Sequence, residues 1–249
     1  MSAAATPMSL NEIGFYFTRA AVGAGAPFGL GEEFAETSRW TAYLGLDPAA
    51  VAVPALRGLA DGGSGIALTF RREANRISVE SGDGRILSAI YAGPVVADRL
   101  LVEAARTGEC RLLLDATDQP LLIAAAVASA DIRANRIAMS WQSRNAGRIV
   151  VELSHGIAAL TGPDAAAIEA SGPAEVEIVL NGVGAEAPPS SQTRTIRLAD
   201  GRSGAVQRGV VMDSAALSTV HDFFSKCLVP STGQSRAAGA GAGNRTDNC

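Results

Sequence analysis

Residues 65–91, GIALTFRREANRISVESGDGRILSAIY, decide the fold class because the repeat of apolar residues changes there. Apolar and polar side chains alternate at Ile66, Leu68 and Phe70, and the alternation resumes from Ile77. A two-residue repeat is typical of a strand that buries one face. The stretch therefore predicts that a sheet begins here.

The same stretch contains a turn signal. The GDG sequence at 82–84 is typical of a tight turn, and residues 86–91 return to a strand-like pattern. We therefore expect an antiparallel meander over residues 66–91. Gly93-Pro94 would end it, and a helix over 95–105 would follow.

Before residue 65 the apolar repeat is that of helices. Ser9 and Glu12 have the spacing of a capping box, in which each side chain accepts a hydrogen bond from the backbone amide of the other residue. A helix is expected from residue 10, a second over about 30–44, and a third from Asp47-Pro48, where an N-cap precedes a proline in the first turn. The sequence thus predicts an N-terminal layer of helices.

Beyond residue 110 strands and helices are mixed. We expect a strand at 112–114, a helix at 121–130, strands at 137–142, 148–153, 175–180 and 193–198, and a final helix capped by Asp213. This order favours an α+β fold, with the N-terminal helical layer packed on a mainly antiparallel mixed sheet, then a C-terminal helix and a glycine-rich tail. We expect one domain over residues 9–228, between a flexible N-terminus at 1–8 and the tail at 229–249.

Composition narrows the classes of function. Of the 249 residues, 47% are hydrophobic and 18% are charged, which is typical of a globular chain. The net charge is −4 and the arginines are scattered singly, so we expect no nucleic-acid partner. The longest apolar stretch, around 121–128, is too short to cross a bilayer, and residues 1–7 lack an export signal. These features favour a cytoplasmic protein without a membrane partner.

Cysteine and histidine are too sparse for a metal site. Cys110, Cys227 and Cys249 lie far apart in the sequence without a CxxC pair, and His155 and His221 stand alone. Ligands for zinc would instead be clustered at short spacings. We expect reduced thiols, no metal and no cofactor.

Both ends of the chain resemble a bacterial family that is classed as a domain of unknown function. The resemblance rests on SLNEI at 9–13, RAA and GAG within 19–25, GLGEE at 29–33 and SRW at 38–40, and on VP at 229–230, SR at 235–236, GAGAG at 239–243 and DN at 247–248. Cys249 departs from the acidic residue expected at the last position. The resemblance implies a bacterial, cytosolic protein and supplies no reaction, because the family has no established activity.

Charged residues on the first two predicted helices form the best candidate site, made of Arg19, Glu32, Glu33, Glu36 and Arg39. Glu36 and Arg39 are three residues apart and can lie on one helix face. In one interpretation Arg39 and Arg19 bind a substrate carboxylate, and Glu36 or Glu33 acts as the catalytic base. In the other, these residues form a solvated surface with weak ion pairs, which is common on exposed helices. The sequence leaves both interpretations open.

Three weaker candidates accompany this site. The start of the second helix, near residues 29–31, presents free amides that suit an anion. His155 can take part in acid–base chemistry, although a lone histidine more often has a structural role. Asp115 and Asp118 flank a turn, where they are either turn and capping residues or a pair of catalytic carboxylates.

The glycine-rich tail has two interpretations. Glycine-rich segments lose much entropy on ordering and bury little surface, which favours disorder. Closely spaced glycines also permit close backbone approach, which favours an ordered strap. In that case Ser235, Arg236 and the glycine backbone at Gly239 and Gly241 would contact an anion or a partner subunit.

Two hypotheses on function follow from these features. In the first, the protein is a small-molecule binding protein or enzyme subunit for a carboxylate or other anionic metabolite, with Arg39, Glu36 and Arg236 as anchors. In the second, it is a non-catalytic accessory protein that docks on a partner enzyme or on a second copy of itself. The sequence favours the first and leaves the reaction, the substrate and the oligomeric state open.

Overall fold

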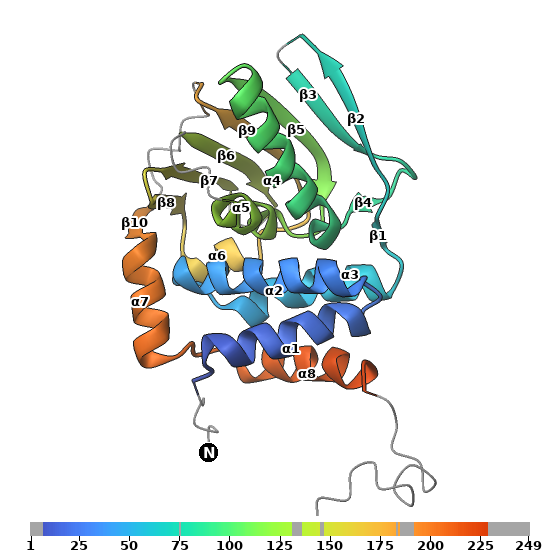
Figure 1. The fold of residues 1–249 in the computed structure, drawn as a ribbon, viewed down its shortest axis with the longest axis vertical. Helices are drawn as coiled ribbons and strands as arrows, with labels where there is room; N and C mark the ends of the chain where they lie inside the picture. The colour runs from blue at the N-terminus through green and yellow to red at the C-terminus, as the bar shows by residue number, and fades with distance from the viewer. Residues whose placement is uncertain are drawn as a thin grey trace, which may run out of the picture.

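A layer of helices lies below one end of a mixed sheet, and the sheet carries two further helices on one face (Figure 1). The structure is a computed structural model that describes residues 7–74, 76–130, 136–144, 147–182, 184 and 192–228. The arrangement of helices and a largely antiparallel sheet confirms the predicted α+β class.

The first and third N-terminal helices begin where their capping residues predict, and the second begins at Phe28, close to the expected residue 30. They are α1 (Leu10–Gly23), α2 (Phe28–Tyr43) and α3 (Pro48–Ala60). Ser9 and Glu12 form the expected capping box, with the Ser9 amide donating to the Glu12 carboxylate over 2.7 Å. The Asp47 carboxylate accepts hydrogen bonds from the first amides of α3. Free amides at both helix starts are therefore satisfied by local side chains.

The sheet is antiparallel on one side and parallel on the other. Its strands are β1 (Ser64–Gly65), β2 (Leu68–Glu73), β3 (Arg76–Ser81), β4 (Ile86–Leu87), β5 (Cys110–Thr117), β6 (Ile137–Ser143), β7 (Gly147–Ser154), β8 (Ile157–Gly162), β9 (Ala174–Leu180) and β10 (Gln192–Arg197). The strand order is β1-β4-β5-β9-β6-β7-β8-β10, and the β2–β3 hairpin joins β5 through β3. The pairs β1–β4, β4–β5 and β3–β5 are parallel, and every other pair is antiparallel.

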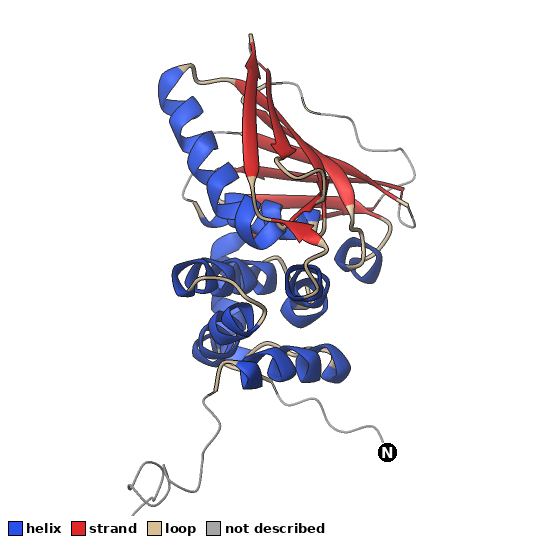
Figure 2. Cartoon of the chain, turned by 90° about the vertical axis from the view of Figure 1, so that its right-hand side faces the viewer, coloured by secondary structure: helices blue, strands red, loops and turns tan. Residues whose placement is uncertain are grey.

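Helices α4 (Ala89–Arg106) and α5 (Pro120–Ser129) cover one face of the sheet, as Figure 2 shows edge-on. They approach each other closely, because a Cβ at Gly93 would lie 3.0 Å from the Cβ of Ala126. Every residue of α5 from Pro120 to Val127 is buried. None of the helices in the described part of the chain is long and apolar enough to cross a membrane.

The predicted strand over 86–91 is wrong beyond its second residue. β4 ends at Leu87, and α4 begins at Ala89 and continues through Gly93-Pro94 instead of starting after them. β4 also pairs in parallel with β1 and β5, so the predicted meander stops after the β2–β3 hairpin. The physical reason is distant in sequence, because the Asp118 carboxylate accepts the Ala89 amide hydrogen over 2.9 Å and caps the early helix start.

Two helices and a strand have no counterpart in the sequence prediction. They are β8, α6 (Ala165–Glu169) and α7 (Leu198–Arg208), whereas α8 (Ser214–Lys226) begins at the predicted Asp213 cap. The sequence of α7, LADGRSGAVQR, contains two glycines and little apolar periodicity. Glycine weakens an isolated helix, so only packing explains why this segment is helical.

The predicted terminal segments lie mostly outside the described residues. Residues 1–6 and the whole tail at 229–249 are not among the described residues. Met8 is described, and it exchanges two backbone hydrogen bonds with Val210, of 2.9 and 2.8 Å. This bridge connects the residues just before α1 with the segment between α7 and α8.

Asp118 is a buried carboxylate at the junction of the sheet and the helices. Its side chain accepts hydrogen bonds from the Ala89 amide and from the Ser64 hydroxyl, the latter over 2.8 Å. Burial raises the pKa of Asp118 from 3.8 to about 6, although both hydrogen bonds act in the opposite direction. The folded chain therefore holds this carboxyl protonated at a pH where the unfolded chain ionises it.

We predict that Asp118 makes the folded state less stable as the pH rises from about 4 to 7. Between the two pKa values the folded chain binds more protons than the unfolded chain, so unfolding becomes easier with rising pH. Relative to Asp118→Asn, which keeps the hydrogen-bonding shape, the wild type should lose about 3 kcal/mol over this range. Urea denaturation of both chains at several pH values measures the difference, and a difference that does not change with pH would contradict the prediction.

Candidate functional site

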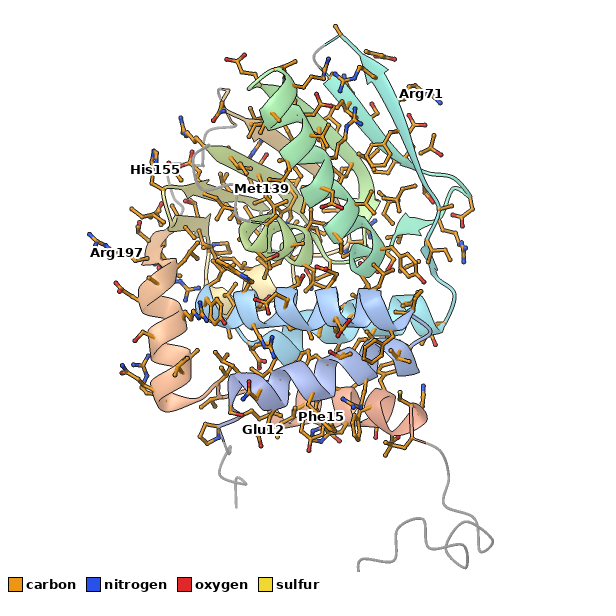
Figure 3. The ribbon with its side chains drawn as sticks, in the orientation of Figure 1. Glu12, Phe15, Arg71, Met139, His155 and Arg197 are labelled. Atoms are coloured by element: carbon orange, nitrogen blue, oxygen red, sulfur yellow. The ribbon has the colours of Figure 1, made fainter. Side chains whose placement is uncertain are left out.

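A cleft of about 1550 Å³ opens between the end of α2, the turn that joins β7 to β8, and the start of α7. The first residues of α1 complete its lining. Figure 3 shows Arg197 at the start of α7, at the same edge of the molecule as His155. Sites for small ligands typically measure 300–1,000 Å³, so a metabolite would occupy only a part of this cleft.

One wall of the cleft is a face of α2. Glu36, Arg39, Trp40 and Tyr43 all line it because residues three, four and seven apart share a helix face. Glu36 and Arg39 form the ion pair that their spacing predicts, with 2.9 Å between Arg39 Nη1 and Glu36 Oε2. The rings of Trp40 and Tyr43 pack edge to face at 5.4 Å. The predicted pair thus lies beside two aromatic side chains.

Arg39 is held in place by α1 as well as by Glu36. Its Nε donates to the Leu10 carbonyl over 2.9 Å. A Cβ at Gly14 would lie 1.9 Å from Arg39 Nη2, so only glycine leaves room for the guanidinium at this point. Gly14 therefore provides the space in which Arg39 crosses from α2 to α1.

The opposite wall comes from β10 and α7. Arg197 and Arg202 line the cleft there, and the described residues contain no ion-pair partner for either. α7 lies close against the end of α2, since a Cβ at Gly201 would be 2.1 Å from the Tyr43 carbonyl oxygen. Sequence analysis missed Arg202 because it did not predict α7, and it missed Arg197 because the strand predicted over 193–198 did not reveal what lies opposite its end. The glycines of α7 were the available signal, as they mark a close contact between helices.

The third side of the cleft is the two-residue turn between β7 and β8. His155 and Gly156 both have positive φ, of 49° and 75°, as the tightest hairpin turns require. The Gly156 carbonyl accepts the Leu198 amide hydrogen over 2.9 Å, which fixes the turn beside the start of α7. His155 thus has a structural role in the turn and also lines the cleft.

The cleft is positively charged although the protein is acidic. Its lining contains three arginines and one carboxylate, Glu36, whereas the whole chain has a net charge of −4. Burial raises the pKa of the Tyr43 phenol, and Glu36 raises it further against the opposing effects of Arg202 and Arg39. The Tyr43 hydroxyl therefore remains a hydrogen-bond donor at neutral pH.

Three other arginines are paired with a carboxylate inside the fold. Glu103 on α4 is buried and paired with Arg72, Arg99 and Arg106, with 2.8 Å to Arg99 and 3.0 Å to Arg106. Burial alone would raise the pKa of Glu103, but the hydrogen bonds from Arg72 and Arg106 outweigh it and lower the pKa. A carboxylate so enclosed is a structural group.

The remaining predicted site residues lie away from the cleft lining. Glu33 is exposed on α2, and Arg19 lies over the Phe15 ring on α1, with its guanidinium carbon 3.9 Å from the ring centroid. Ser235, Arg236, Gly239 and Gly241 lie outside the described residues. Of the predicted set, the structure therefore brings Glu36 and Arg39 to the cleft.

The described residues also define which other chemistry the fold can hold. No three of their histidine, cysteine, aspartate and glutamate side chains gather as metal ligands would. Burial, reinforced by Glu103, raises the pKa of the Cys110 thiol to about 11, so this thiol is a poor nucleophile. The cleft is thus the strongest site in the described chain.

Comparison with known proteins places the fold but not the chemistry. The family described as a protein of unknown function (DUF3726) matches residues 8–64, which include the α2 wall of the cleft. Among proteins with curated descriptions, none matches the sequence. The resemblance of the N-terminal part to an uncharacterised domain family is therefore confirmed.

Solved dehydrogenases share the fold at low sequence identity. Malate dehydrogenase from Pyrococcus horikoshii aligns over 92% of this chain and 97% of its own, with 9% identity and a TM-score of 0.60. Malate dehydrogenase from Entamoeba histolytica aligns over 91% and 99%, with 6% identity and a TM-score of 0.58. Sulfolactate dehydrogenase from Methanocaldococcus jannaschii aligns over 89% and 97%, with 7% identity and a TM-score of 0.56. These similarities show a shared fold.

We predict that Gly14→Ala and Arg39→Ala act non-additively on stability. In the wild type the new methyl group displaces the guanidinium from Leu10 and Glu36, which costs about 1.5–3 kcal/mol. This cost exceeds the gain in helix propensity, which is about 1 kcal/mol. In the Arg39→Ala background the methyl group meets no guanidinium, so Gly14→Ala should be stabilising.

Chemical denaturation of the four chains of this double-mutant cycle measures the coupling free energy. The expected result is a change of sign for Gly14→Ala between the two backgrounds. The same effect in both backgrounds would show that Arg39 is not held against α1.

Proposed function

We propose that the cleft binds a small metabolite through a carboxylate or another anionic group, and that the protein is an enzyme or enzyme subunit acting on that metabolite. The observation that supports this proposal is the charge of the cleft lining, which contains three arginines and a single carboxylate in a chain of net charge −4. Guanidinium groups bind carboxylates through paired, charge-assisted hydrogen bonds. The resemblance to a bacterial family adds the bacterial cytoplasm as the proposed setting.

The two walls have different roles in this proposal. Arg197 and Arg202, which have no ion-pair partner among the described residues, make first contact with the anion. Arg39 is already oriented by Leu10 and Glu36, so it loses little entropy when it binds a ligand. Tyr43 donates a hydrogen bond to the ligand, and Glu36, which is paired with Arg39, has the predicted role of base.

The shared fold is compatible with this substrate class. The solved neighbours are named as dehydrogenases of malate and sulfolactate, which are short hydroxy acids. For this chain the likeness is one of fold, so the substrate class rests on the arginines of the cleft.

We predict that short carboxylates stabilise the protein and that the arginines of the cleft account for it. Pyruvate, L-lactate and L-malate are the probes, each compared with chloride at equal ionic strength in a thermal-shift titration. A ligand at about 100 times its dissociation constant stabilises the folded state by about 2.7 kcal/mol. Arg202→Gln should weaken binding by about tenfold or more, because it removes a charge-assisted contact.

The matched control is Arg71→Gln, which removes the same charge from an arginine on β2 that is 63% exposed and lies outside the cleft. It should leave the affinity unchanged. Equal weakening by both variants would show that the carboxylates respond to net charge alone and would contradict a specific site.

The accessory role is the second candidate, favoured by exposed aromatic surface on the helical layer. Phe15 is 46% exposed on α1 and Phe28 is 58% exposed on α2. In this case no probe would stabilise the protein, and Phe15→Ser would change the molar mass measured by light scattering. A monomer with the same mass in both chains would contradict self-association through this surface.

A further inference from the structure

A small recess lies next to the cleft. It has a volume of about 30 Å³, roughly two water-sized spheres. The recess and the cleft share lining from Trp40, Leu198 and the β7–β8 turn. The two cavities are therefore adjacent.

The walls of the recess are mainly apolar. Its apolar lining includes Val127 and Ala128 from the end of α5, Ile137 from β6, Leu153 from β7 and Trp40 from α2, and its polar lining side chains are Ser154 and His155. Such a wall offers few hydrogen bonds to water or to a second charged group, because an unpaired polar group pays a desolvation cost there. The recess thus favours an alkyl group.

The recess lies directly beside the proposed anion site. Arg39 is followed in sequence by Trp40, and Arg197 by Leu198, so on both walls an arginine of the cleft adjoins a residue that lines the recess. Neighbouring Cα atoms are about 3.8 Å apart. On both walls the anion site and the recess are therefore lined by consecutive residues, which suits one short molecule that reaches both.

We infer that the ligand of the cleft is a short-chain monocarboxylate whose alkyl group, of about two or three carbons, occupies the recess. This inference rests on the proposed function, since the carboxylate is held by the arginines described above. It separates the ligand from malate and sulfolactate, named for the neighbours, because their second anionic group does not suit an apolar wall.

The test is the dependence of affinity on chain length. Apparent dissociation constants are measured for acetate, propionate, butyrate and hexanoate by thermal-shift titration of the full chain. Each methylene buried should tighten binding roughly fourfold. The gain should stop once the recess is full, so hexanoate should bind no more tightly than butyrate.

A variant that fills the recess provides the second arm. Ala128→Leu places a larger side chain in a recess that has room for it, so acetate should still bind while the gain along the series disappears. The matched control is Ala215→Leu, at an exposed position on α8 outside both cavities, and it should reproduce the wild-type series.

The outcomes separate this inference from the proposed function. If acetate binds but affinity does not rise with chain length, the recess does not hold the alkyl group and the inference fails while the anion site stands. A rise that persists in Ala128→Leu overturns it as well. If none of the four acids binds, the proposed function fails and the inference fails with it. The wild-type series decides the matter even where Ala128→Leu does not fold.

Discussion

Helix α5 is apolar on every side, and the rest of the structure is arranged to enclose it. All its residues from Pro120 to Val127 are buried, so no face can turn to solvent without a cost of roughly 25 cal/mol per Å² of apolar surface exposed. α2 and α4 pack against it, and β9 contacts it from the sheet. The helical layer and the sheet therefore have to meet along this helix, which explains why two separately patterned halves of the sequence form one core.

Polar side chains just before α5 fix the start of this helix and connect the helical layer to the sheet. The side-chain amide of Gln119 donates hydrogen bonds to the backbone carbonyls of Val51 in α3 and Glu169 in α6. Beside it, Asp118 connects the start of α4 to Ser64 of β1. Buried polar groups are expensive unless they are paired, so these contacts also specify which elements adjoin the helix.

The cleft opens where the enclosure of α5 ends. The last turn of the helix lines the recess, and the end of α2, the β7–β8 turn and α7 surround the adjoining space. The distribution of arginines then gives this space its charge. Arg72, Arg99 and Arg106 each form an ion pair with the buried Glu103, whereas Arg197 and Arg202 face the cleft without an ion-pair partner in the described chain. An acidic protein can thus present a positive site, because charge is distributed by packing and not by composition.

The sequence by itself determined the local elements and the pairing on one helix face. The capping residues placed α1 and α3, alternation placed the β2–β3 hairpin, and the three-residue spacing placed Glu36 beside Arg39. These features depend on neighbours within a few residues, which a repeat or a cap records directly. The same spacing fits a solvated surface pair, so it did not identify the site.

Only the tertiary structure decided what faces Arg39 across the cleft. α4 begins early because Asp118, from the end of another strand, caps it, and the glycine-containing α7 is helical where it packs against Tyr43. Arg197 and Arg202 reach the cleft through that contact. A local sequence pattern indicates which face of a helix or strand is buried. The element that packs against that face is decided by long-range packing, which here is organised around α5. That packing brings arginines from distant parts of the sequence together.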